Sequence, residues 1–174
     1  MIPRILLNQP PPPTVQVRTI WRPQTAGRAV EVVVLSPAPL SLWTHWQEGR
    51  TYPCLVQLNP DGAAVETPCP CCQAGMRRVW RGYLGAQSAR RGTIGIVEIT
   101  RGAVQSCPAL WEDRGKLRGR KLVLRRQGSA KNGRVLADLA ELLPPDSADL
   151  PPPPEVWETL AYIWGRNGFY EESQ

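Results

Sequence analysis

The chain has 174 residues, enough for one medium-sized domain with short additional segments. Its 19 prolines and 15 glycines indicate that much of the chain is turn, loop or extended segment. No run of about 18 apolar residues is present, and the segment after Met1 is too short for the apolar core of a secretory signal. We therefore expect an intracellular protein that does not span a membrane.

The net charge of +6 is distributed unevenly along the chain. Residues 1–72 hold five basic residues (Lys and Arg) and four acidic residues (Asp and Glu). Residues 73–134 hold fifteen basic and three acidic residues, whereas residues 135–174 hold one basic and eight acidic residues. So strong an excess in the middle segment is typical of proteins that bind a polyanion, and it favours nucleic acid over a merely solvated basic surface. The acidic segment is also expected to lie over the basic one and compete with nucleic acid.

The first part of the chain alternates between extended and turn-rich segments. Residues 1–14 end in four prolines and are expected to form an extended arm. Residues 28–36 are rich in β-branched side chains and predict a strand, and a second short strand is expected from Leu42 to Trp46. From Gly49 to Gly75 the chain is rich in turn residues and has no apolar core of its own.

The second part predicts two strand pairs with a helix between them. Strands are expected at 78–87 and 93–100, a helical region at 101–113, and a hairpin of strands at 120–127 and 133–141. About five strands with one helix before the last two is the order of a five-stranded Greek-key barrel of the oligonucleotide-binding (OB) type. A small sandwich would have a similar strand count.

The resulting fold class is mainly β, with an inserted metal-binding subdomain and a few short helices. We place the barrel at 15–143, with the metal subdomain at about 45–76. Residues 144–174 are expected to form a proline-rich linker, Pro144–Pro154, and a short acidic C-terminal helix with apolar side chains between Val156 and Trp164.

The turn-rich segment contains a group of potential metal ligands. Its residues His45, Cys54, Cys69 and Cys72 offer one imidazole and three thiols, a standard ligand set for one structural Zn²⁺. His45 is the only histidine of the chain, and four of the five cysteines lie between Cys54 and Cys72, which suits a metal site better than a set of disulfides. A metal would supply the core that this segment lacks.

The fourth ligand is an open choice between Cys71 and Cys72. Two residues separate Cys69 from Cys72, which is the usual spacing of a zinc knuckle, and Gly75 then follows where backbone amides are expected to approach the thiolates. Cys107 lies far from this group and is expected to be a small buried apolar residue.

Three strings of the sequence resemble the zinc-containing OB-fold single-stranded-DNA-binding proteins of bacteriophages and similar bacterial proteins. They are His45-Trp-x-x-Gly-Arg-Thr-x-Pro-Cys54, Cys69-Pro-x-Cys72-x-x-Gly75 and Arg81-Gly-Tyr-Leu84. The resemblance implies a zinc subdomain inserted into an OB barrel, with single-stranded DNA bound in the cleft between them. It also implies a cytoplasmic location in a bacterial or phage-infected cell, with replication or recombination proteins as further partners.

Single-strand binding requires cations for phosphates and aromatic faces for bases. Alternation along the strand at 78–87 places Trp80 and Leu84 in the core, and Arg81 and Tyr83 in a binding groove. Trp43 and Trp46, which lie on either side of His45 in the sequence, are expected either to pack the metal subdomain or to stack on bases. The candidate DNA-binding residues are Arg77, Arg78, Arg81, Tyr83, Arg118, Arg120, Lys121, Arg125, Arg126, Lys131 and Arg134.

The function expected from these features is non-enzymatic binding of single-stranded DNA without sequence specificity, in replication, recombination or a related process. The alternative is a zinc-stabilised adaptor in a nucleic-acid-processing complex, with its proline-rich segments as docking sites. A metal-dependent nuclease is disfavoured because the sequence offers neither an acidic cluster nor a second histidine for catalysis.

Overall fold

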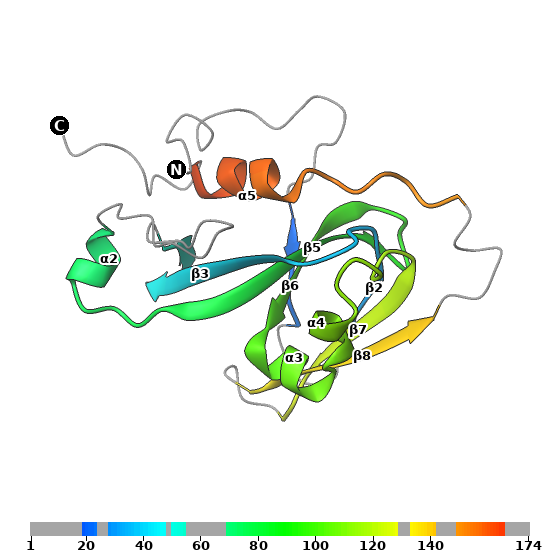
Figure 1. Ribbon diagram of the computed structural model, residues 1–174, viewed down its shortest axis with the longest axis horizontal. Coiled ribbons are helices and arrows are strands. Elements are labelled where there is room, and N and C mark those ends of the chain that lie inside the picture. The colour runs from blue at the N-terminus through cyan, green and yellow to red at the C-terminus, as the bar shows by residue number, and fades with distance from the viewer. Residues whose placement is uncertain are drawn as a thin grey trace.

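A computed structural model describes residues 19–23, 28–47, 50–54, 69–128, 133–141 and 149–165. This part of the protein is mainly β, as expected, with one mixed sheet and a few short helices (Figure 1). The strands are β1 Ile20–Trp21, β2 Val30–Val34, β3 Leu40–Gln47, β4 Arg50–Pro53, β5 Val79–Ser88, β6 Ile94–Thr100, β7 Arg120–Arg126 and β8 Val135–Glu141. The helices are α2 Pro70–Gln73, α3 Arg101–Ser106, α4 Ala109–Glu112 and α5 Val156–Gly165.

The sheet is built around the long strand β5. Its order is β1-β6-β5-β2-β7-β8, and β3 pairs with both β5 and β4. The first half of β5 pairs with β3, where Tyr83 lies opposite Leu40, and the second half pairs with β2, where Ala86 lies opposite Val34. β1 runs parallel to β6, and every other pair is antiparallel. Within the described ranges no ladder joins β8 to β6 or β1, so the sheet is open.

The predicted strands and helices are all present, and three short elements were not predicted. β2, β3, β5, β6, β7 and β8 lie at the expected places, as do α3, α4 and α5. The unpredicted elements are β1, β4 and α2, of two to four residues each. The expected arm at 1–14 and the first residues of the expected linker, 144–148, lie outside the described residues.

Each face of the β5–β6 hairpin packs against a different layer. On one face Leu84, Val97 and Ile99 are fully buried in the main core, which also includes Leu122 of β7 and Ala103 of α3. This arrangement confirms that Leu84 belongs to the core, and Trp80 packs against the same cluster.

On the other face, Tyr83 and Ile96 are buried in a second core to which α5 contributes Leu160 and Trp164. Figure 1 shows α5 lying along the sheet. None of the helices in the described part of the chain is both long and apolar enough to cross a lipid bilayer.

The segment before α5 is attached to the sheet along its described length. Arg118 donates hydrogen bonds through Nη2 to the carbonyl oxygens of Leu150 (2.9 Å) and Pro151 (3.0 Å). Pro154 lies directly over Gly85, where a Cβ would come within 2.5 Å of the proline ring. A glycine is therefore required at position 85, and contacts of Leu150, Pro151 and Pro154 hold this segment against the rest of the fold.

Candidate metal centre and arginine-lined cleft

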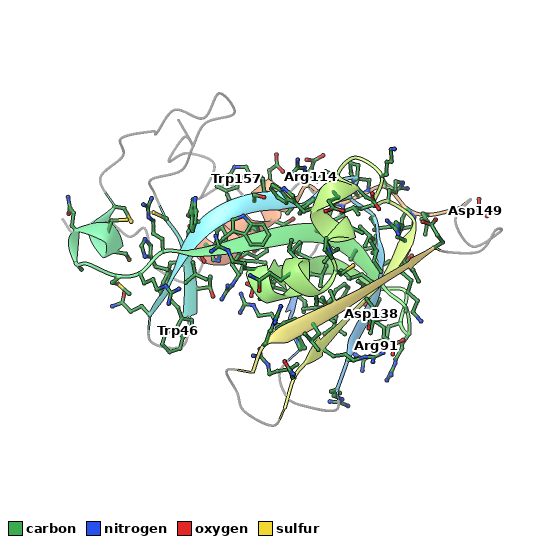
Figure 2. The ribbon with its side chains drawn as sticks, turned by 60° about the horizontal axis from the view of Figure 1, so that its bottom comes forward. Trp46, Arg91, Arg114, Asp138, Asp149 and Trp157 are labelled. Carbon is green, nitrogen blue, oxygen red and sulfur yellow. The ribbon has the colours of Figure 1, made fainter. Side chains whose placement is uncertain are left out.

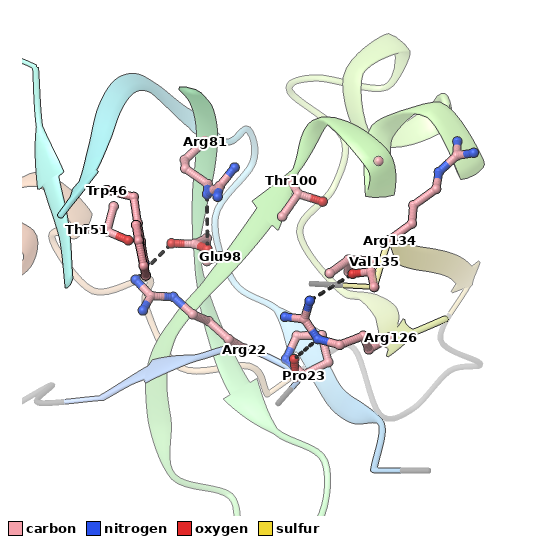
Figure 3. A pocket seen from close by; sticks show the side chains of 12 residues that line it. Arg22, Pro23, Trp46, Thr51, Arg81, Glu98, Thr100, Arg126, Arg134 and Val135 are labelled. Atoms are coloured by element: carbon pink, nitrogen blue, oxygen red, sulfur yellow. Dashed lines mark hydrogen bonds and ion pairs between the residues drawn. The ribbon is translucent and has the colours of Figure 1, made fainter. Parts of the chain in front are cut away.

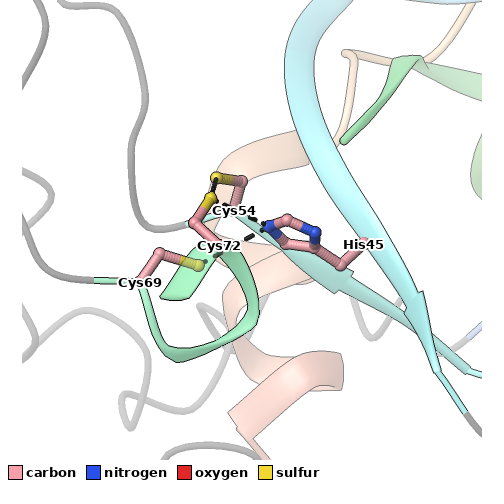
Figure 4. A group of neighbouring side chains, drawn as sticks. All are labelled: His45, Cys54, Cys69 and Cys72. Atoms are coloured by element: carbon pink, nitrogen blue, oxygen red, sulfur yellow. Dashed lines mark hydrogen bonds between the residues drawn. The ribbon is translucent and has the colours of Figure 1, made fainter. Parts of the chain in front are cut away.

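Four side chains from three segments converge at the end of the β3–β4 hairpin. They are His45 of β3, Cys54 after β4, and Cys69 and Cys72 around α2 (Figure 4). Their ligand atoms all lie within 4.8 Å of one another, and three of the four residues are fully buried. One imidazole and three thiols in this arrangement can hold a single metal ion.

The separations between these atoms fit tetrahedral coordination. Nε2 of His45 lies 3.5 Å from Sγ of both Cys69 and Cys72, and Sγ of Cys54 lies 3.5 Å from Sγ of Cys72. Typical Zn–N and Zn–S bond lengths in a tetrahedron place the ligand atoms about 3.6–3.8 Å apart. The group is therefore consistent with one structural zinc ion.

The imidazole of His45 is oriented for coordination through Nε2. Its Nδ1 lies 3.2 Å from the carbonyl oxygen of Arg77, so Nδ1 carries the proton and Nε2 presents its lone pair to the thiols. Burial lowers the pKa of His45, and the positive charge of Arg78 acts in the same direction, against the opposing hydrogen bond to Arg77. The histidine is accordingly held in the neutral form that a metal requires.

The turn after α2 selects Cys72 over Cys71. Gly75 has φ +72° and ends the helix, with hydrogen bonds from Gly75 N to Cys72 O (3.0 Å) and from Met76 N to Cys71 O (2.9 Å). This C-cap directs Cys72 toward the other three ligands and leaves Cys71 outside the group. A glycine is favoured at position 75 because its φ is positive. Its amide donates to the carbonyl oxygen of Cys72 and not to a thiolate.

Cys71 is buried next to the metal group without belonging to it. Burial raises the pKa of its thiol, and the neighbouring Cys69 and Cys72 raise it further. The preference for Cys72 in the sequence prediction is supported by its position among the other three ligand atoms.

A cleft of about 570 Å³ lies between the β3–β4 hairpin and the β7–β8 hairpin (Figure 3). Four of the side chains that line it are arginines, from β5, β7 and two loop segments: Arg22, Arg81, Arg126 and Arg134. Thr51 and Trp46, both on the β3–β4 hairpin, line the side nearest the metal subdomain. The cleft therefore combines a concentration of positive charge with an aromatic side chain.

One acidic residue, Glu98, lies among the cleft arginines. Its Oε2 is 2.9 Å from Nη2 of Arg22 and accepts a hydrogen bond from the hydroxyl of Tyr83 (3.2 Å), while its Oε1 is 3.3 Å from Nε of Arg81. Burial raises the pKa of Tyr83 well above its usual range, and the charge of Glu98 adds to the effect. The phenol consequently remains protonated and acts as the donor.

Trp46 is the most exposed of the large apolar side chains that the structure describes. It projects from the end of β3 with 63% of its surface exposed (Figure 2). It shares the cleft face of the hairpin with Thr51, its cross-strand partner on β4. Trp43, on the opposite face, packs against the cysteine cluster. Of the two roles expected for Trp46, its exposure fits stacking on a base better than packing of the subdomain.

Three of the predicted DNA-binding residues, Arg81, Arg126 and Arg134, line the cleft. Arg126 donates hydrogen bonds to the carbonyl oxygens of Pro23 (3.0 Å) and Gly133 (2.8 Å), which connects β7 to two other parts of the cleft. Arg134 is exposed and donates to Gln105 (3.2 Å).

The prediction that Tyr83 lines the groove was wrong. The residue is fully buried, its ring packs edge-on against Trp164 of α5, and no face of it is free for a base. Alternation correctly placed Tyr83 on the same face as Arg81, but α5 covers that half of the face.

The other predicted residues that the structure describes do not line the cleft. Arg118 holds the C-terminal segment, Arg120 is paired with Asp113 and Glu141, and Lys121 is paired with Glu31. Arg77, Arg78 and Arg125 are exposed, and Arg78 lies over the ring of Trp43. Lys131 lies outside the described residues.

Two cleft residues, Arg22 and Glu98, were missed by sequence reasoning. Arg22 follows a strand of only two residues whose partner, β6, is more than seventy residues away, so no local pattern indicates its position. Glu98 did leave a signal, because it is the single charged residue in the otherwise apolar run Ile94–Ile99.

Comparisons with protein families, curated proteins and solved structures find no match for this chain.

Proposed function

We propose that this protein binds single-stranded DNA, without sequence specificity, in the arginine-lined cleft. The observation that carries the proposal is the presence of four arginines and the exposed indole of Trp46 around one cleft. Single-strand binders combine these two features, since arginine contacts the phosphates of any sequence and an aromatic face stacks on any base. An open cleft lined in this way supports binding rather than catalysis.

We also propose that the sheet is a partly open variant of the OB barrel. Three features support this assignment: β2 lies between β5 and β7, the β5–β6 and β7–β8 pairs are antiparallel hairpins, and α3 connects the two pairs. β2 and β3 together would correspond to the bent first strand of such a barrel. The cleft then lies on the outer face of the β5–β6 hairpin.

The metal in this account is one structural Zn²⁺ held by His45, Cys54, Cys69 and Cys72. All four protein ligands belong to one closed group, with no position left open for a substrate. The ion would fix the end of β3, which carries Trp46 directly after His45. Zinc therefore supports the cleft without taking part in any reaction.

A titration of fluorescently labelled oligonucleotides tests the proposal. We expect the protein to bind oligo(dT) and mixed-sequence single strands with similar affinity, and a duplex of the same length at least tenfold more weakly. Duplex preference, or absence of binding at low salt, would contradict the proposal; absence of binding would favour the adaptor function instead. RNA of the same sequence, run in parallel, determines whether the cleft distinguishes the two sugars.

A further inference from the structure

Glu98 is a buried carboxylate in a cleft that otherwise attracts anions. Only 7% of its side chain is exposed, and both of its oxygens face cationic groups, Arg22 on one side and Arg81 on the other (Figure 3). A carboxylate at this position repels a phosphate if only net charge is considered. Its presence therefore requires a different explanation.

Arg22 and Arg81 reach the cleft from different parts of the sheet. Arg22 follows β1, whereas Arg81 lies within β5, and their guanidinium groups approach the same carboxylate. Without Glu98 the two cations would repel each other, and each long side chain would sample many rotamers. The carboxylate fixes both groups at one distance from each other.

Both arginines retain unused hydrogen-bonding capacity. Nε of Arg22 and Nε of Arg81 are buried and have no hydrogen-bond acceptor among the described residues, since Nε of Arg81 is near Glu98 but not directed at it. Unsatisfied buried donors are rare in native proteins and call for a specific acceptor. Both residues line the cleft, and each guanidinium group carries further N–H donors besides Nε for a phosphate oxygen.

We propose that Glu98 is a positioning residue that holds Arg22 and Arg81 as a preformed subsite for one phosphodiester of the bound strand. This inference rests on the proposed binding of single-stranded DNA. Two guanidinium groups and one carboxylate give the subsite one net positive charge, which matches the single negative charge of a backbone phosphodiester. Tyr83 anchors Glu98 from below and is itself fixed by Trp164, so the subsite is rigid before DNA arrives.

The substitution Glu98→Gln tests this role, because the two explanations of Glu98 predict opposite changes in DNA affinity. A carboxylate that only repels phosphate predicts tighter binding and a steeper salt dependence for E98Q. A positioning role predicts roughly tenfold weaker binding of oligo(dT), the loss of about one charge-assisted hydrogen bond. It also predicts a plot of log K against log salt that is shallower by up to about 0.7, for one phosphate that is no longer neutralised.

Glu141→Gln is the matched control. It makes the same change of charge in a side chain that is 80% exposed and pairs with Arg120, which does not line the cleft. We expect its affinity and salt dependence to equal those of the wild type. A decrease for E141Q equal to that for E98Q would overturn the positioning role, because the effect would then not depend on a carboxylate between the cleft arginines.

Tyr83→Phe provides a second test in case E98Q does not fold. It removes only the hydroxyl that donates to Glu98 and should weaken binding two- to threefold without changing the charge. Unchanged affinity of Y83F, or tighter binding by E98Q, would refute the role of Glu98 while wild-type binding stands. A wild-type protein that does not bind single strands would refute the proposed function itself.

Discussion

Trp46 is the residue on which the stacking part of the account depends. It lies at the cleft and contributes to none of the described core clusters, so its removal should leave the fold intact. One stacked base is worth about 1–3 kcal/mol, so Trp46→Ala should weaken oligo(dT) binding by about 5- to 150-fold. Thermal unfolding by circular dichroism should show an unchanged melting temperature.

Trp111→Ala is the control for this substitution. Trp111 is the second exposed tryptophan, at 38%, but it lies on α4 against Trp80, outside the cleft lining. Its loss should leave DNA affinity within twofold of the wild type. If W111A weakens binding and W46A does not, the DNA path follows α4 and not the cleft.

At the residue scale, the sequence pattern predicted on which face of a strand a side chain lies better than it predicted whether that side chain is exposed. The alternation in β5 correctly separated Arg81 and Tyr83 from Trp80 and Leu84. It could not show that Tyr83 is covered, because the covering helix lies more than seventy residues further along the chain. Arg118 and Arg120 illustrate the same limit: their charge is visible in the sequence, but the carbonyl and carboxylate partners that engage them are not.

At the scale of elements, strongly patterned segments were predictable and short ones were not. The hairpin strands β7 and β8 were expected from their apolar alternation on either side of an Asn-Gly turn. β1 has two residues and is held only by its parallel pairing with β6, so tertiary contacts and not local propensity define it. The four candidate metal ligands were predictable because one imidazole and three thiols in one segment are a standard ligand set for a single ion.

Removal of the metal should release one group of elements and leave the rest folded. Among the described strands β4 pairs with β3 alone, and Cys69 and Cys72 bring α2 to the same hairpin, whereas neither large core contains a metal ligand. After chelation we expect weaker DNA binding, since Trp46 loses its fixed position, and retention of most of the far-ultraviolet circular dichroism. Complete unfolding would show that the metal holds the entire domain.

Paired substitutions locate the fourth ligand. Cys72→Ala should abolish stoichiometric zinc, measured by atomic absorption, and should reproduce the effect of chelation on DNA binding. Cys71→Ala removes a neighbouring buried thiol outside the ligand group and should retain one zinc per chain. Equal zinc loss in both variants would contradict the assignment of Cys72.

At the scale of the whole molecule, the C-terminal segment belongs to the fold. Its helix α5 buries Leu160 and Trp164 against Tyr83 and Ile96, so its absence would expose an apolar sheet face. The charge pattern had suggested that this segment competes with DNA and that deleting it raises affinity. The structure leads to a different expectation, because α5 lies on the apolar half of the face and leaves the cleft arginines uncovered.

Leu160→Ala measures this contribution without truncation. The side chain is fully buried, and its loss should lower the free energy of unfolding by about 2–5 kcal/mol. Glu155→Ala, an exposed position just before α5, should have no such effect.

Deletion of residues 149–174 should destabilise the protein further. If the truncated protein instead unfolds at the wild-type temperature and binds DNA more tightly, the competition hypothesis is correct.

The most direct test of the central claim is the salt dependence of oligo(dT) binding, measured by fluorescence anisotropy for the wild type and for an Arg126→Gln/Arg134→Gln variant. Both arginines line the cleft, and each should account for about 0.7 of the slope of log K against log salt. The account predicts a variant slope shallower by about 1.4, with no comparable change for Arg125→Gln, an exposed arginine outside the cleft. A wild-type slope near zero, or one that depends on Arg125 and not on Arg126 and Arg134, would contradict it.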